Sequence, residues 1–103
     1  MDGDEVRIAR NESRRRDVNE AIEEGRRDRG GPVGFVCECG QLGCTAVLEM
    51  TLGDYDAARR HPRRFVVATG HEQPQVETVV GGHGAWLLVE KQGLAGTVAE
   101  SLR

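Results

Sequence analysis

Three cysteines within eight positions constrain this chain more than any other feature of its sequence. They are Cys37, Cys39 and Cys44, and Gly40 and Gly43 lie between the second and the third. On an extended segment, residues i and i+2 point to the same side, so the first two thiols face one way. The two glycines permit a sharp turn that brings Cys44 back beside them. Three sulfurs then occupy three corners of a small polyhedron, which predicts a metal site.

A histidine is the natural fourth ligand, because zinc takes four ligands in a tetrahedron and sites of three cysteines and one histidine are common. We choose His71, which follows a predicted strand whose end would lie beside the cysteine loop. His61 lies among arginines, whose charge disfavours a cation, and His83 lies in a predicted turn between glycines. The sequence therefore predicts zinc held by Cys37, Cys39, Cys44 and His71.

A disulfide and buried free thiols are the two alternatives to a metal site at the cysteine cluster. A disulfide is disfavoured because the cysteines are odd in number, a pair two residues apart is strained, and we expect a reducing compartment. Free cysteines pack well in a core, but packing alone does not require them to gather around two glycines. A metal site remains the favoured interpretation, and iron would fit the same sulfur-rich tetrahedral site as zinc.

The predicted ligand set indicates a structural ion and no enzymatic activity. Four protein ligands close the coordination sphere, and three thiolates make the ion a weak Lewis acid. Glu38 stands between two of the cysteines and is expected to point to the opposite face, where it is no candidate for a general base. The sequence offers no paired carboxylates or activated nucleophile independent of the metal.

The order of helix and strand signals predicts an α+β fold: an N-terminal helix, then a small, mostly antiparallel sheet with a zinc-binding β-hairpin (zinc-ribbon-like) and one short helix. Residues 5–24 lack Gly and Pro, and Ile8, Val18, Ala21 and Ile22 fall near one helical face. The short helix is expected at 54–60, capped by Thr51 or Asp54, and the tail after Gly93 as one helical turn or disordered. Strands are expected at 33–38, 45–52, 65–68, 76–80 and 85–90. The predicted core anchors are Phe35, Tyr55, Phe65 and Trp86.

Charge divides the chain unevenly. Residues 1–31 hold nine acidic and eight basic side chains, and the rest of the chain holds eight and six. We therefore predict a charged N-terminal helix with a Gly/Pro hinge over 1–31, a zinc-stabilised domain over 32–92 and a C-terminal tail over 93–103. No apolar run approaches the roughly 18–20 residues of a membrane helix, and the acidic start lacks the apolar stretch of a secretory signal. We expect a cytoplasmic protein with no membrane partner.

Short motifs spread over residues 7–91 carry a family resemblance. They are Arg10-Asn11-Glu12, Val18-Asn19-Glu20, Phe35-x-Cys37-Glu38-Cys39-Gly40-x3-Cys44, Leu52-x2-Tyr55-x3-Arg59, Arg64-Phe65-Val66-Val67-x2-Gly70-His71 and Val89-Glu90-Lys91. Together they resemble a family of small actinobacterial zinc-binding proteins. The resemblance implies the same four ligands and supplies no biochemical activity. It also implies apolar residues in the middle of the leading helix, where this chain has Arg14 and Arg15, so the helix is expected either to detach or to pack through another face.

The function favoured by the sequence is a non-enzymatic zinc-binding module for protein interaction or regulation, with the N-terminal helix offered to a partner or to a second copy of the chain. A thiolate-based redox or metal sensor is one alternative, because zinc-bound thiolates are nucleophilic. A nucleic-acid-binding regulator is another, through the arginines of 14–16 and 59–64. The net charge of −3 disfavours that alternative, and the arginines equally fit a solvated surface balanced by acids.

Overall fold

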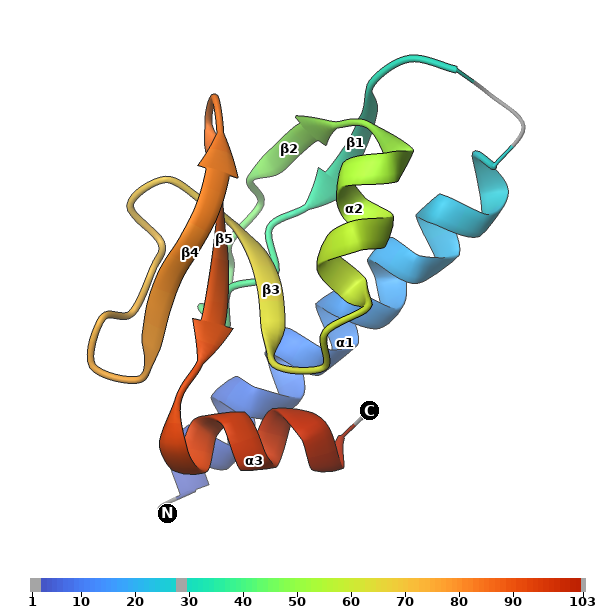
Figure 1. Ribbon diagram of the computed structural model, residues 1–103. Helices are drawn as coiled ribbons and strands as arrows, with labels where there is room; N and C mark the ends of the chain where they lie inside the picture. Colours follow the sequence, from blue (N-terminus) through green and yellow to red (C-terminus); the bar gives the residue numbers. More distant parts are fainter. Residues whose placement is uncertain (1–2, 28–29, 103) are drawn as a thin grey trace.

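The computed structural model describes residues 3–27 and 30–102, and it confirms the predicted α+β class. Residues 1–2, 28–29 and 103, which belong to the predicted terminal segments, lie outside the described residues. Figure 1 shows the long helix α1 running behind the strands and α2, with α3 crossing near its N-terminal end. The elements in chain order are α1 (Gly3–Gly25), β1 (Val33–Val36), β2 (Val47–Met50), α2 (Leu52–Arg59), β3 (Arg64–Ala68), β4 (Glu77–His83), β5 (Trp86–Lys91) and α3 (Gly93–Ser101).

The strands form two small antiparallel sheets rather than one. Strands β1 and β2 pair with each other, and the second sheet has the order β3-β5-β4. The segment that follows β1 links the two sheets: the Cys37 amide donates to the Ala46 carbonyl at 3.0 Å, and the Glu38 amide donates to the Val66 carbonyl at 2.8 Å. The cysteine loop is therefore the seam between the sheets.

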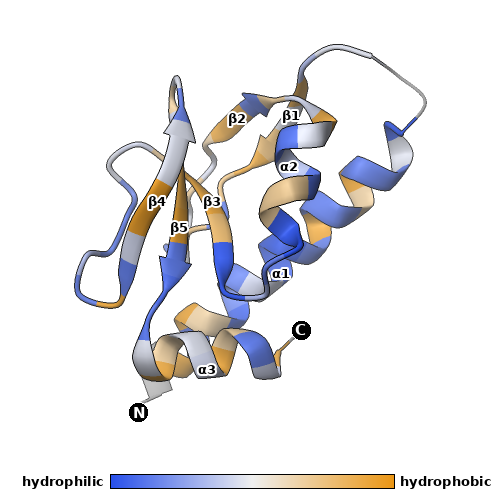
Figure 2. Ribbon diagram, viewed as in Figure 1, coloured by the Kyte–Doolittle hydropathy of each residue, from blue (hydrophilic) through white to orange (hydrophobic). Residues whose placement is uncertain are grey.

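The apolar core lies between the two sheets and α2, and it contains all four predicted aromatic anchors. Phe35 and Tyr55 stack with ring centroids 4.4 Å apart, and Phe65 and Trp86 are also buried. Figure 2 shows hydrophobic segments along the strands and a largely hydrophilic α1. Aromatic rings supply much of the burial that so small a core can reach.

Helix α1 packs on the domain mainly through polar side chains, which corrects in part the apolar face expected from the sequence. Val18 is 48% exposed and Ala21 is exposed, whereas Ile22 packs against the core and Ile8 is half-buried, so only part of the predicted stripe faces the interior. The buried side chains lie on one helical face, with steps of three or four residues from Glu12 to Glu23 and with Ser13 next to Glu12. They are Glu12, Ser13, Arg16, Asn19 and Glu23. A hydropathy pattern misses this face because its polar groups bind partners inside the protein.

Arg16 shows how such a face is satisfied. Its side chain is 1% exposed, its guanidinium lies 4.3 Å from the centre of the Phe65 ring, and Nη1 donates to the Pro62 carbonyl at 2.8 Å. A guanidinium can stack on an aromatic ring and donate in its own plane at the same time. Helix α1 is therefore docked on the domain despite the arginines in its middle.

A second buried polar group is the Lys91 cluster, which consists of Lys91, Glu12 and Glu77. Lys91 Nζ bonds to a carboxylate oxygen of Glu12 and, at 2.5 Å, to one of Glu77. All three side chains are at most 7% exposed. The Glu77 carboxylate also accepts from the Gln73 amide at 2.8 Å. The cluster joins α1 to the adjoining ends of β4 and β5.

Two local expectations are wrong, the one for the tail after Gly93 and the one for the turn at residues 81–84. The tail after residue 92 forms the nine-residue helix α3, which packs against β5 and α1. His83 belongs to strand β4 and not to a four-residue turn, because the strand continues through Gly81 and Gly82 and the chain reverses at Gly84 (φ 65°).

Thr51 caps α2 as expected, with its hydroxyl accepting from the Asp54 amide at 3.0 Å. In the part of the chain that the structure describes, no helix is long and apolar enough to cross a membrane.

Candidate metal centre

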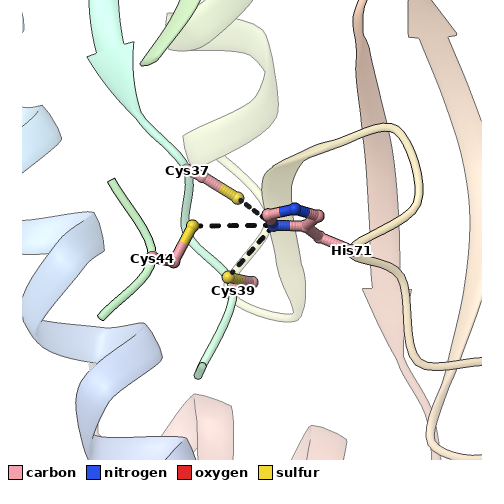
Figure 3. A group of neighbouring side chains, drawn as sticks. All are labelled: Cys37, Cys39, Cys44 and His71. Atoms are coloured by element: carbon pink, nitrogen blue, oxygen red, sulfur yellow. Dashed lines mark hydrogen bonds between the residues drawn. The ribbon is translucent and has the colours of Figure 1, made fainter. Parts of the chain in front are cut away.

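The structure brings together the four side chains that the sequence nominates as ligands. The Sγ atoms of Cys37, Cys39 and Cys44 and a ring nitrogen of His71 all lie within 4.8 Å of one another. In Figure 3 the three thiols converge on the Nδ1 edge of the imidazole. We call these four residues the Cys3His cluster, and a group of this kind could hold a metal ion.

The distances from the His71 ring nitrogen to the three sulfurs match the nitrogen–sulfur edges of a tetrahedral site. His71 Nδ1 lies 3.5, 3.6 and 3.5 Å from the Sγ atoms of Cys37, Cys39 and Cys44. An ion at tetrahedral angles, with metal–sulfur bonds near 2.3 Å and a metal–nitrogen bond near 2.0–2.1 Å, would give nitrogen–sulfur edges of about 3.6 Å. The three nitrogen–sulfur distances are therefore close to those that a central tetrahedral ion would give.

Two turns place the ligands. Gly43 has φ 79°, a conformation that a side chain disfavours, and the Cys44 amide donates to the Gln41 carbonyl at 3.3 Å, which returns the loop toward its start. Gly70 has φ 94°, and the His71 amide donates to the Ala68 carbonyl at 2.9 Å just beyond the end of β3. The histidine therefore reaches the cysteine loop from the neighbouring sheet.

The surroundings of the sulfurs differ. Cys37 and Cys39 are 1% and 2% exposed, whereas Cys44 is only half-buried. The Ala68 amide donates to Cys37 Sγ at 3.2 Å, and the Arg15 guanidinium donates to Cys39 Sγ at 3.4 Å. Burial raises the pKa of the Cys37 thiol to about 12. The free thiol is therefore protonated at neutral pH, and a metal ion has to displace that proton on binding.

Glu38 lies between two of the cysteines and ties their loop to three other elements. Its carboxylate accepts from Asn19 Nδ2 of α1 at 2.9 Å, from the Tyr55 hydroxyl of α2 at 2.7 Å and from the Val66 amide of β3 at 3.0 Å. Burial raises the pKa of Glu38 to about 6, and the hydrogen bonds from Asn19 and Tyr55 oppose the shift. Local sequence patterns do not reveal this organising role, because the partners lie 17 to 28 positions away.

The other two histidines lie apart from the cluster. His61 Nδ1 accepts from the Arg63 amide at 3.2 Å, and its Nε2 lies 3.6 Å from a Glu90 carboxylate oxygen. His83 is an exposed residue at the end of β4. Neither belongs to the group that could bind a metal ion within the residues described.

The arginines of the 59–64 segment are engaged in ion pairs. Each has a carboxylate within 3 Å: Arg59 with Glu23 at 2.6 Å, Arg60 with Asp56 at 2.7 Å, Arg63 with Glu100 at 2.5 Å and Arg64 with Glu90 at 2.9 Å. The paired acids come from α1, α2, β5 and α3. The segment thus connects elements of the fold and carries little unbalanced positive charge.

Comparison of the chain with protein-family models, with curated proteins and with solved structures found no match in any of the three.

Proposed function

We propose that this chain is a non-enzymatic zinc-binding module in which a structural ion fixes the cysteine loop and so maintains a surface for protein interaction or regulation. The observation that carries the proposal is the equal spacing of the three Sγ atoms from one ring nitrogen, 3.5 to 3.6 Å. A soft, sulfur-rich tetrahedral set suits zinc, and iron is the other ion that such a set accepts.

The donor set supports a structural role for the ion. Four protein ligands fill a tetrahedral sphere and leave no position for water or substrate. The burial of Cys37 and Cys39 further restricts access to the ion. The loop that carries these ligands contacts both sheets, so an ion held there would fix the seam between them.

Metal analysis of protein purified without added metal tests the proposal. We expect one equivalent of zinc in the unmodified chain and much weaker retention in Cys39→Ser and His71→Ala. His61→Ala and His83→Ala are matched controls, because these histidines lie outside the Cys3His cluster, and both should retain the ion. An unmodified chain that binds neither zinc nor iron would contradict the proposal, and one equivalent of iron would change the assigned ion.

The solvent face of α1 is the surface we propose for a partner or for self-association. It carries exposed side chains of both signs together with the 48%-exposed Val18. Mixed charge around an apolar residue suits a polar, reversible protein contact. Sedimentation of the chain at increasing concentration, compared with Val18→Glu, tests self-association: the unmodified chain should dimerise more strongly than the variant.

A redox or metal sensor is the second candidate, and the exposure of Cys44 favours it. This cysteine is the least buried of the three thiols and is the one that an oxidant would meet first. Zinc release under mild peroxide, followed with a chromogenic chelator, would support a sensor. Retention of the ion under the same treatment would contradict the sensor and would be consistent with the structural module. A nucleic-acid function has less support, because the arginines of 59–64 are paired with carboxylates.

A further inference from the structure

The Arg15 guanidinium joins helix α1 to the loop that carries the cysteines. Its Nη1 donates to the Cys39 carbonyl at 2.7 Å, and its Nη2 donates to the Gln41 carbonyl at 2.7 Å. Nη1 also lies 3.5 Å from the Cys37 carbonyl. One planar side chain thereby fixes the backbone around two of the three sulfurs.

The same side chain touches a ligand atom directly. Arg15 Nη1 donates to Cys39 Sγ at 3.4 Å. A divalent ion bound by three thiolates and a neutral histidine has a net charge of −1, which the guanidinium offsets. Groups that hydrogen-bond to metal ligands orient them, and their loss costs roughly 10- to 100-fold in metal affinity.

Two further contacts align α1 with this segment. Asn19 brackets Val36, donating to its carbonyl and accepting from its amide, both at 2.8 Å. Ile8 lies so close to Gly40 that a Cβ on the glycine would be 2.3 Å from its Cγ2. The helix therefore contacts the loop on either side of Arg15, and the arginine is held in place between these contacts.

We infer that Arg15 is a positioning residue of the metal centre, which holds Cys39 and the Cys39–Gln41 turn in the ligating conformation. The inference rests on the proposed metal-binding function. Because binding free energies are reciprocal, an arginine that strengthens metal binding is itself held more firmly when the metal is bound. Docking of the middle of α1 is thus coupled to metal occupancy.

Metal affinity measured by chelator competition tests the inference, with Arg15→Gln against Arg14→Gln. Arg14 is the adjacent exposed arginine, so its substitution changes the net charge equally without touching the loop. We expect Arg15→Gln to lose roughly 10- to 100-fold in affinity and Arg14→Gln to remain within about twofold. Arg15→Lys keeps a charge near Cys39 without bridging two carbonyls, so its affinity should be intermediate.

A spectroscopic readout separates positioning from a general loss of stability. In the Co2+-loaded protein, an N–H donor on a thiolate stabilises the sulfur lone pair and raises the energy of the sulfur-to-cobalt charge-transfer band. We expect this band to move to longer wavelength in Arg15→Gln, less in Arg15→Lys and not in Arg14→Gln. Arg15→Lys also decides the matter if Arg15→Gln does not fold, because an unshifted band with the affinity of the unmodified chain would overturn the inference.

The outcomes distinguish this inference from the proposed function. If the unmodified chain binds no metal, the proposed function fails and this inference fails with it. If the unmodified chain binds zinc and the Arg15 variants bind it equally well, only the positioning role of Arg15 is overturned.

Discussion

The Cys3His cluster and the Lys91 cluster use opposite chemistries to join distant parts of the same small chain. The first gathers three thiols and an imidazole, a donor set that could hold a metal ion. The second is complete in itself, because Lys91 provides the cation for Glu12 and Glu77. The chain thus contains one cluster that could be completed by a metal ion and one ionic cluster that is complete without it, and α1 contacts both.

The comparison explains why a helix with a polar face can dock at all. Each buried polar residue of α1 meets a specific partner: Arg16 the Pro62 carbonyl, Asn19 the backbone of Val36, and Glu12 the ammonium of Lys91. Buried polar groups are tolerated when they form hydrogen bonds, and these bonds form only when the helix is correctly oriented relative to its partners. The helix therefore gains orientation from contacts that provide little hydrophobic stabilisation.

Metal removal should have the largest effect on this arrangement. Zinc binding in small domains contributes on the order of 10–16 kcal/mol, as much as the whole stability of a typical domain. We expect chelation to lower the melting temperature sharply and to speed amide exchange throughout β1 and β2. Identical melting curves with and without chelator would contradict a structural ion.

Replacing the lysine of the Lys91 cluster should have the next largest effect. Lys91→Met leaves the carboxylates of Glu12 and Glu77 buried together without a cation, and broken buried pairs cost about 3–5 kcal/mol. Chemical denaturation measures the loss. The triple variant Lys91→Met, Glu12→Gln, Glu77→Gln is the control, and it should recover much of the stability because no unpaired charge remains. Loss of metal along with stability in Lys91→Met would show that the two clusters are not independent.

The two clusters also differ in how far the sequence reveals them. Cysteines are rare, and three within eight positions predict their own convergence, so a histidine at the end of a predicted strand completed the set. The Lys91 cluster joins positions 12, 77 and 91, and each is a common surface residue type with no local pattern around it. The helices and strands could also be predicted, because glycine, proline and the alternation of apolar residues are local signals. The buried face of α1 did not, because its partners are set by tertiary contacts.

Substitution of the carboxylate between the cysteines should have a moderate effect. The Glu38 carboxylate accepts three hydrogen bonds and donates none. In Glu38→Gln an NH2 group replaces one of the accepting oxygens and faces another hydrogen-bond donor. An unsatisfied buried group costs about 1–3 kcal/mol. Denaturation of the zinc-loaded protein measures the effect, and the exposed Glu49→Gln serves as the control. If the free energy of unfolding fell no further than in the control, Glu38 would not stabilise the seam between the sheets.

The stability gap between the unmodified chain and Glu38→Gln should also depend on pH. The pKa of Glu38 in the folded protein, about 6, lies above its ordinary value of 4.5, so protonation favours the folded state. Stability from this group is therefore present at low pH and lost as the pH rises through 6. Between pH 7.5 and 5.5 the unmodified chain should gain about 1 kcal/mol relative to Glu38→Gln, whose amide does not titrate. Both proteins are measured at a saturating concentration of the same metal ion, and a gap that stays constant with pH would contradict the raised pKa of Glu38.

The smallest effect is expected from breaking an ion pair at the surface. Arg60 pairs with Asp56 across one helical turn, and its side chain is 77% exposed. Exposed pairs of this spacing contribute about 0.3–0.5 kcal/mol and are screened by salt, so Arg60→Gln should be nearly neutral in 0.5 M salt. Urea denaturation at low and high salt measures this difference. If Arg60→Gln lowered the free energy of unfolding as much as Lys91→Met, exposed ion pairs would stabilise this fold as strongly as buried ones. Burial would then not explain the large effect expected for Lys91.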